Sequence, residues 1–485
     1  MRILLVVLTL ALSVVVVGGT TQPGPLAILN VTIVDGTGAP PREANVVVRE
    51  GRIAAITREA SPAGATVVDG RGKFLIPGLW DMHVHLATRP EPELAEKMIL
   101  PLLLAHGIVG VRDMGGPLDR VLELREKVAR GEIPGPRILT PGPFVDGPGD
   151  ASPLFRRPAD AGAAAGVAKE LIEGGVDFIK VQSGLAPEIH SALARAARTA
   201  KRPLAGHVPI AMTAETVMQA GQRSVEHVSP ALVGDGMLLF ALSSESDALL
   251  RELRQIEQDR AGTQPGAIAE REAILRKRLV ETYDPMKART LGNWMKDREV
   301  WIVPTLIWSA TLRPLTKDED GTNLPMELVP ASLRTRWLER RKEYVARQAP
   351  EGFAAAAAVA RAAARAVRDL HVAGAQVLAG TDAFDAFVVP GHSLHQELKL
   401  LVDAGLSPME ALRTSTQAAA EYRGTARTEG TIEIGRRADL VLLDADPGAD
   451  ISNTRRVHAV VTGGKVYDRD ALDKLLRDVR AFTAQ

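Results

Sequence analysis

Short apolar runs alternate with longer helical stretches along most of the chain. Continuous runs of this kind are typical of strands buried in a parallel sheet, and the stretches between them suit crossover helices. Eight strands are predicted, one before His83 and the others at residues 108–112, 137–140, 177–181, 202–207, 224–227, 301–305 and 375–380. Eight strands that each precede a helix predict an α/β fold, a (β/α)8 TIM-type barrel over residues 77–425.

The two ends of the chain have a different pattern, rich in β-branched residues and broken by glycines. Strands are predicted at residues 27–35, 44–49 and 51–56, and again at 438–444 and 457–467. The unit at the N-terminal end is too short to hold a catalytic cleft by itself, and the strands of the C-terminal end are expected to pack with it. The prediction is a small β-sandwich domain built from residues 23–76 and 426–485, with a closing helix after residue 470.

Two segments inside the barrel region are too long for simple crossovers. Residues 230–296 and 309–350 are charge-rich and largely helical in pattern. Insertions on this side of a barrel often form a lid or a substrate wall. A solvated surface decoration or a subunit contact explains the same pattern equally well, and the sequence leaves both open.

The first 22 residues have the pattern of a signal peptide. Arg2 precedes an almost wholly apolar run, and small residues follow at Gly18, Gly19 and Thr20. The run is short for a transmembrane span. We therefore expect an exported protein, periplasmic or secreted, that has no membrane contact after cleavage; an uncleaved anchor is the alternative.

Charge and cysteine content narrow the possible functions. The 485 residues include 59 Lys plus Arg, 59 Asp plus Glu, and no cysteine. A net charge of zero argues against nucleic-acid binding by bulk charge. Without thiolates, a metal would have to be held by nitrogen and oxygen, which suits zinc, manganese, iron or nickel.

His83 and His85 are the first candidate metal ligands. Residues two apart on a strand point to the same face, so both imidazoles would be directed at one point. Two ordinary histidines on a half-buried strand would give the same spacing. Four further candidates end other predicted strands, which makes coincidence less plausible: Lys180, His207, His227 and Asp382.

Lys180 and Asp382 each have a structural alternative. A buried ammonium is costly without a partner, so Lys180 could form a salt bridge to a carboxylate at a strand end. Asp382 could cap the following helix. Lys180 could instead serve a metal centre if it were carbamylated by carbon dioxide, which would make it an anionic oxygen ligand.

The chain resembles the amidohydrolase superfamily, and within it the imidazolonepropionase-like and metal-dependent prolidase-like branch. The motifs that carry this resemblance lie at residues 76–85, 177–181, 206–207, 226–227, 380–382, 391–398 and 430–441. The resemblance implies two divalent metal ions, usually Zn²⁺. It assigns His83, His85 and Asp382 to one metal, His207 and His227 to the other, and carbamylated Lys180 to a bridge between them. Asp382 would then be the catalytic proton acceptor.

Such a site is expected to hydrolyse a small molecule at an amide-type carbon–nitrogen bond, as in an N-acyl amino acid or a dipeptide. The alternative is hydrolysis or deamination of cyclic amides or imidazolone-like rings. Hydrolysis of a phosphoester or a lactone also remains open, as does a non-catalytic homologue that only binds its ligand. Relatives in this superfamily often form homo-oligomers, so the resemblance implies that this chain could form one as well.

Two histidines and three arginines are the candidates for contact with a substrate. His392 and His395 would share a helix face after the last strand, although a structural role is slightly favoured. Arg112, Arg156 and Arg157 are the candidates for binding a substrate carboxylate, although arginines of this kind are more often surface or salt-bridge residues. The loop at residues 141–150 lacks the histidine associated with dipeptidase-type relatives, which argues against that specificity.

Overall fold

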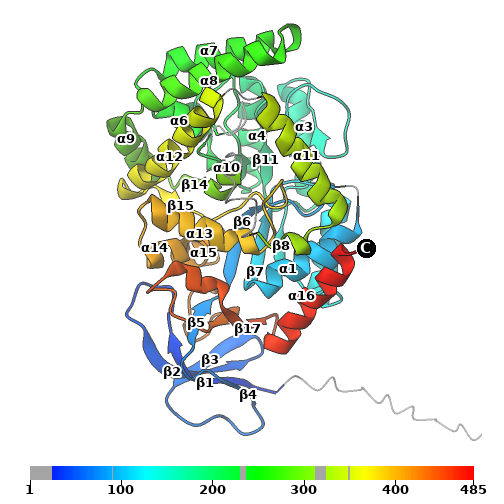
Figure 1. Ribbon diagram of the computed structural model, residues 1–485. Helices are drawn as coiled ribbons and strands as arrows, with labels where there is room; N and C mark the ends of the chain where they lie inside the picture. Colours follow the sequence, from blue (N-terminus) through cyan, green and yellow to red (C-terminus); the bar gives the residue numbers. More distant parts are fainter. Residues whose placement is uncertain (1–23, 90, 230–235, 312–323, 348–349) are drawn as a thin grey trace, which may run out of the picture.

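The computed structural model describes residues 24–89, 91–229, 236–311, 324–347 and 350–485 (Figure 1). The predicted signal peptide, and the charged middle of the second insertion, lie outside these residues. Among the described helices, none combines the length and apolarity that crossing a bilayer requires.

Both ends of the chain contribute to one mixed sheet, seen in blue and red at the bottom of Figure 1. Strand β5 (Phe74–Pro77) joins the two parts, because it pairs with β1 (Leu26–Ile33) on one side and antiparallel with β16 (Leu440–Leu443) on the other. The remaining strands are β2 (Arg42–Arg49), β3 (Arg52–Thr57), β4 (Thr66–Asp69), β17 (Val457–Thr462) and β18 (Lys465–Tyr467). The eight strands hydrogen-bond as a single sheet, so the two-layered sandwich stays a prediction.

The central region contains two parallel sheets. The first consists of β6 (Leu79–Val84), β7 (Ile108–Asp113) and β8 (Arg137–Leu139). The second has the order β10-β9-β11-β12-β13-β14-β15, from β9 (Phe144–Val145), β10 (Phe155–Arg156), β11 (Ile179–Val181), β12 (Leu204–Gly206), β13 (Gln222–Glu226), β14 (Trp301–Val303) and β15 (Gln376–Val377). The α/β fold with parallel sheets is therefore confirmed. Strands β9 and β10 were not predicted, since two residues carry no readable periodicity.

Backbone hydrogen bonds link the two parallel sheets at both of their seams. Met82 N donates to Ala379 O at 2.9 Å, just after β15, and Asp177 N donates to Thr140 O at 2.9 Å, just after β8. At the first seam Gly380 is needed, because a Cβ there would lie 2.8 Å from the His83 Cβ. The absent side chain allows the segment after β15 to approach β6 closely.

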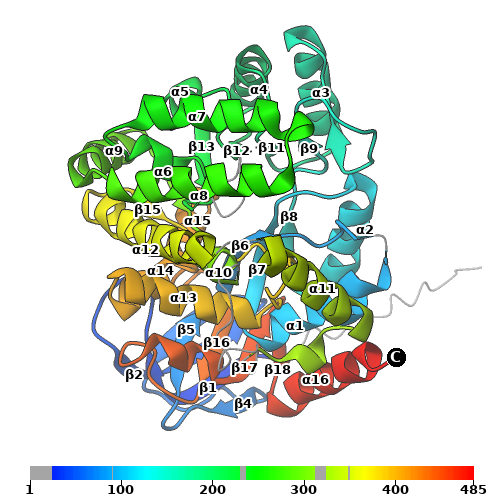
Figure 2. The same cartoon turned by 45° about the horizontal axis from the view of Figure 1, so that its top comes forward.

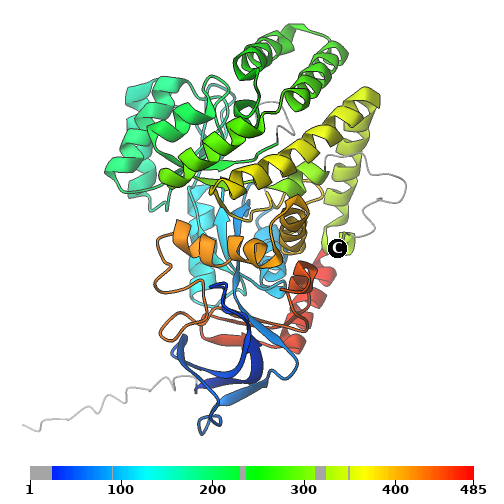
Figure 3. The same ribbon diagram turned by 90° about the vertical axis from the view of Figure 1, so that its left-hand side faces the viewer.

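Helices cover the parallel strands, and the closing helix α16 (Arg469–Thr483) packs against α1 (Leu100–Ala105) (Figure 3). A helix with π-type hydrogen bonding, Ala95–Ile99, leads into α1. The other helices outside the two insertions are α2 (Leu118–Ala129), α3 (Ala161–Glu173), α4 (Pro187–Thr199), α5 (Ala214–Ala220), α12 (Pro350–Val372), α13 (His392–Ala404), α14 (Pro408–Thr414) and α15 (Gln417–Tyr422).

The two insertions are helical, as their pattern predicted. In Figure 2 the first runs over the molecule as two long helices side by side, α7 (Ser246–Asp259) and α8 (Pro265–Glu281), and the second contributes α11 (Ala331–Arg347). Shorter or flanking helices are α6 (Leu238–Ala241), α9 (Pro285–Asp297) and α10 (Leu306–Thr311). Helix α7 buries Leu249, Leu250, Leu253 and Ile256, so one face packs inward and the charged face is outside.

A buried ion cluster joins the parallel sheets to the mixed sheet. Glu429 accepts hydrogen bonds from Arg423 and Arg137, and Arg137 also donates to Asp439 at 2.8 Å. The Trp80 ring lies near both guanidinium groups, 3.5 Å from that of Arg423 and 5.0 Å from that of Arg137. Burial tends to raise the pKa of Glu429, but the charges of Arg423 and Arg137 hold it at about 2.

The variant Glu429→Gln is expected to lower stability by roughly 3 kcal/mol at neutral pH, the free energy that corresponds to this pKa depression. Since the folded-state pKa lies below the unfolded value, the stabilisation is present above about pH 4.5 and is lost as the pH falls towards 2. Urea unfolding at pH 7 and at pH 3 measures this, with exposed Glu59→Gln as the control. A deficit that is equally large at both pH values would contradict this explanation.

Candidate metal centre

The six predicted ligands lie at or near strand ends that face one side of the parallel sheets. His83 is in β6, Lys180 is in β11, and His207 and His227 directly follow β12 and β13. Their side chains are buried, as is that of Asp382, whereas His85 is partly exposed. The strands therefore direct polar groups into a largely water-excluded space, where a ligand or a metal would stabilise them.

Asp382 is the point on which the imidazoles converge. Its Oδ1 lies 3.0 Å from His85 Nε2 and 3.4 Å from His83 Nε2, and its Oδ2 lies 3.9 Å from His227 Nε2. The His207 and His227 ring centroids are 4.9 Å apart. One ligand atom each from His83, His227 and Asp382 falls within 4.8 Å of the others, a spacing that could hold a metal ion.

Each imidazole is oriented through its other nitrogen. Nδ1 contacts Glu226 Oε2 at 3.0 Å in His83, Ser183 Oγ at 2.8 Å in His207, Thr305 Oγ1 at 2.7 Å in His227 and, more weakly, Gly115 O at 3.5 Å in His85. Holding Nδ1 in this way leaves Nε2 directed towards the centre. This is the arrangement that fixes the ring and tautomer of histidines that bind metals.

The backbone is unusual at the same place. His227, Thr305 and Asp382 have φ angles of 61°, 48° and 65°, in the left-handed region that non-glycine residues rarely adopt. Such conformations cost free energy and persist where surrounding contacts fix them. Asp81 supplies those contacts for Asp382, because it accepts from Thr381 Oγ1 at 2.7 Å and from His83 N at 3.2 Å.

The protonation states suit metal binding. Burial lowers the pKa of His83 to about 4, although the nearby carboxylates of Asp382 and Glu226 oppose the shift, and burial lowers the pKa of His227 as well. Burial tends to raise the pKa of Asp382, but the neighbouring histidines hold it well below its ordinary value. At neutral pH this part of the site offers neutral imidazoles and an anionic oxygen.

Lys180 belongs to this cluster. Its side chain is buried, and its charge contributes to the lowered pKa values of His83 and His227 and opposes the raised pKa of His85. The donor set is therefore nitrogen and oxygen only, which fits zinc and similar divalent ions. An ammonium beside so many metal-ligand candidates also fits conversion to a carbamate, since that change would remove the positive charge.

The residues predicted to contact substrate lie elsewhere. His395 contacts Thr454 Oγ1 at 3.0 Å and His106 O at 3.1 Å, and the His392 ring packs edge-on against that of His106. These contacts support the structural role that the sequence slightly favoured for His392 and His395, and a role in substrate contact stays a prediction. Arg156 and Arg157 form ion pairs with Glu170 and Asp146.

Arg112 requires a correction. Its guanidinium is fully buried and donates to Met82 O, Ser224 Oγ and Tyr422 OH. It also forms a double contact with Glu226, at 2.8 Å to each oxygen. With these donors used inside the protein, Arg112 holds Glu226 against His83 and does not present itself to a substrate.

Known proteins resemble this chain in sequence and in fold. The model of the amidohydrolase family matches residues 74–467. Among solved structures, bottromycin amidohydrolase superposes with a TM-score of 0.70 at 23% identity, covering 96% of this chain and 91% of that one. A Xaa-Pro dipeptidase with methionine bound in its active site gives 0.63 at 19% identity, covering 92% of this chain and 100% of that one. These two similarities show the fold.

A curated relative is more similar over a short stretch. N-acyl-D-aspartate deacylase of Alcaligenes xylosoxydans xylosoxydans is 43% identical over 68 residues, which is 13% of this chain and only 14% of that protein's length. The family match is far broader and includes every residue of the proposed metal centre. The chain belongs to the amidohydrolase family.

Proposed function

We propose that the protein is an exported, binuclear metal-dependent hydrolase that cleaves an amide-type bond in an N-acyl amino acid or a dipeptide. Action on carbon–nitrogen bonds follows from membership of the amidohydrolase family. The observation that carries the proposal is the convergence of histidine Nε2 atoms on Asp382 while each Nδ1 is held by a protein oxygen. Export depends on the sequence of residues 1–22 alone.

The proposed scaffold is a closed (β/α)8 barrel, from about residue 77 to 425, beside a small β-domain. The hydrogen bonds at both seams between the parallel sheets support closure. In such barrels the active site lies at the carboxyl ends of the strands. The predicted ligands occupy these ends, which supports the site as the catalytic one.

His83, His85 and Asp382 would hold one metal, His207 and His227 the other, and carbamylated Lys180 would bridge the two. Two divalent cations, when bound, would lower the pKa of a shared water and polarise the scissile carbonyl. Lys180 is near enough to affect the pKa values of three of the histidines, which supports its place in the bridge.

Asp382 would move the proton. Its depressed pKa keeps the carboxylate ionised, so it can accept a proton from the attacking water. The same group would then donate that proton to the leaving nitrogen. Asp81 fixes the backbone next to Asp382, since Thr381 N and Oγ1 both donate to the Asp81 carboxylate.

The named relatives favour linear amides as the substrate class. A Xaa-Pro dipeptidase is among the proteins of similar fold, and a deacylase of N-acyl-D-aspartate is among those of similar sequence. Hydrolysis or deamination of rings remains the alternative, because the same site could perform it and an adenine deaminase is also among the proteins of similar sequence.

A substrate panel tests this proposal. The protein without residues 1–22, supplied with zinc and bicarbonate, is incubated with N-acyl amino acids, dipeptides and cyclic amides. Turnover of linear amides, lost on chelation and restored by zinc, is expected. Turnover of rings alone would favour the alternative, whereas metal binding without any turnover would contradict the proposed substrate class. Absence of both metal and turnover would favour a non-catalytic homologue.

The variant Lys180→Ala is expected to reduce bound metal from two ions to one or fewer per chain, and to abolish turnover. Both effects are expected because alanine cannot form the carbamate whose oxygens would bridge the two metals. Elemental analysis of the purified protein measures the metal content, with Lys169→Ala, on the exposed face of α3, as the control. Addition of a short-chain carboxylate should restore part of the activity. Two retained metals in Lys180→Ala would contradict the bridge.

A further inference from the structure

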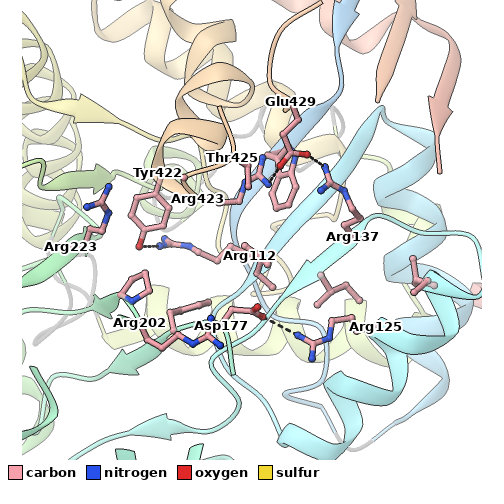
Figure 4. Close-up of a pocket in the computed structure, with 18 of the residues that line it drawn as sticks. Arg112, Arg125, Arg137, Asp177, Arg202, Arg223, Tyr422, Arg423, Thr425 and Glu429 are labelled. Carbon is pink, nitrogen blue, oxygen red and sulfur yellow. Dashed lines mark hydrogen bonds and ion pairs between the residues drawn. The ribbon is translucent and has the colours of Figure 1, made fainter. Parts of the chain in front are cut away.

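A cavity of about 1160 Å³ lies at the opposite ends of the strands from the metal centre (Figure 4). Its lining includes Arg137 at the start of β8, Asp177 just before β11, Gln222 at the start of β13 and Val300 just before β14. Lys180 lies within β11 and His227 directly follows β13, whereas the cavity is lined at or just before the starts of these strands and includes none of the six metal-centre residues, so it is separate from that site. Its volume is ample for a small-molecule ligand.

The lining of this cavity is strongly basic. Twelve lysine and arginine side chains line it, against two carboxylates, Asp177 and Glu429. The whole chain, in contrast, carries equal numbers of basic and acidic residues. A concave surface lined by one sign of charge concentrates its field and attracts ligands of the opposite sign.

Several of these cations are already neutralised inside the protein. Arg125 pairs with Asp177 at 3.1 Å, and Arg137 and Arg423 share Glu429. Arg112, beneath the cavity, pairs with Glu226. Figure 4 shows the Arg125–Asp177 pair on the opposite side of the pocket from Arg137, Arg423 and Glu429, with Arg112 between them and Tyr422 beside Arg112.

Five other cations that line the cavity form no ion pair within the described part of the chain. They are exposed and come from both sides of the pocket: Arg198, Lys201, Arg202, Arg298 and Lys465. Like charges gathered in this way repel one another unless a counter-charge is supplied. Within the described residues no carboxylate forms an ion pair with these five, and the charge of Asp177, which acts on Arg202, is already paired with Arg125, so an external anion would supply the missing counter-charge.

Two buried guanidinium nitrogens in the lining of the cavity also favour an external anion. Arg423 Nη2 and Arg137 Nε are buried and have no hydrogen-bond partner among the residues that the structure describes, although both residues line the cavity. The Arg423 side chain is only 6% exposed. A buried donor without an acceptor is unfavourable, and an anion with several oxygens would satisfy it.

The aromatic side chains do not favour a planar ring as the ligand. Guanidinium groups already lie over three of the four aromatic rings in the lining: Arg112 and Arg223 over Tyr422, Arg112 over Phe178, and Arg137 and Arg423 over Trp80. Recognition would therefore depend on charge and hydrogen bonds. We propose that this cavity binds a compact multivalent oxyanion, of the phosphate or polycarboxylate class, at a site separate from the metal centre.

Calorimetry on the metal-loaded full chain tests the proposal, with pyrophosphate and citrate as probes for the two sources of oxyanion and acetate as the monovalent comparison. The double variant Arg202→Gln/Arg298→Gln is expected to lose affinity for the preferred probe by at least roughly tenfold, because two charges without partners are removed. The matched control Arg49→Gln/Arg58→Gln removes two exposed charges from the mixed sheet and its edge, away from the cavity.

Binding of pyrophosphate or citrate that is weakened by the cavity variant and not by the control supports the proposal and names the source. Equal losses in both variants would overturn it, since the effect would then be general charge attraction. Absence of binding by either probe, or binding of duplex RNA in preference to both, would also overturn it. Binding is read directly, so the result is independent of whether the proposed hydrolase activity is found.

Discussion

Replacement of Asp382 by asparagine is expected to lower kcat/KM for amide hydrolysis by at least about 10³-fold, within the range for loss of a positioned proton-transfer group. Asparagine has nearly the same shape but cannot accept the proton of the attacking water, and it is a poorer metal ligand. Steady-state kinetics and a metal assay measure the two effects. The exposed Asp119→Asn is the control. Activity within tenfold of the wild type would contradict the role given to Asp382.

Loss of the buried Arg112–Glu226 pair is expected to have the largest effect on stability. Arg112→Met leaves the Glu226 carboxylate buried without its cation, which costs about 3–5 kcal/mol in comparable sites. Both side chains are at most 1% exposed, so water cannot compensate. The double variant Arg112→Met/Glu226→Gln removes both charges and is expected to recover part of the loss.

Urea unfolding of the wild type, the two single variants and the double variant measures the coupling between Arg112 and Glu226. Strong non-additivity is the expected result. A loss below about 1 kcal/mol in Arg112→Met would contradict the account, because a buried carboxylate that loses its partner cannot be nearly neutral in cost.

The architecture was largely readable from the sequence. Apolar runs separated by helical stretches predicted the parallel strands, and the β-branched segments at the two ends predicted that both would join one β-unit. The structure pairs β5 with β16 across more than 360 residues of sequence. What the sequence could not provide was the arrangement inside that unit, since pairing partners are decided by packing and not by local pattern.

The candidate metal ligands were also predicted, because each ends its own apolar run. The residues that orient them were missed. Glu226 contacts His83 from 143 residues away, and Thr305 contacts His227 from 78 residues away. Such partners depend on which strand ends become neighbours. A signal was present in Asp81, which alternates with His83 and His85 on one strand face, and in Glu226, which directly precedes His227.

Arg112 shows why residue type alone misleads. An arginine near a site suggests a substrate carboxylate, yet this one is enclosed by Glu226, Ser224 and Tyr422. Its burial could not be predicted from a single apolar strand, because the carboxylate that stabilises it belongs to another strand. The basic cavity was missed for the same reason, since its cations come from many separate loops.

Anomalous X-ray diffraction at the zinc edge, on crystals grown with zinc and bicarbonate, tests the central claim most directly. The account predicts two peaks among His83, His85, Lys180, His207, His227 and Asp382, with carbamate density on Lys180 between them. A single peak would contradict the binuclear site. Absence of any peak among these residues, in protein that retains amide hydrolysis, would contradict the metal-dependent account as a whole.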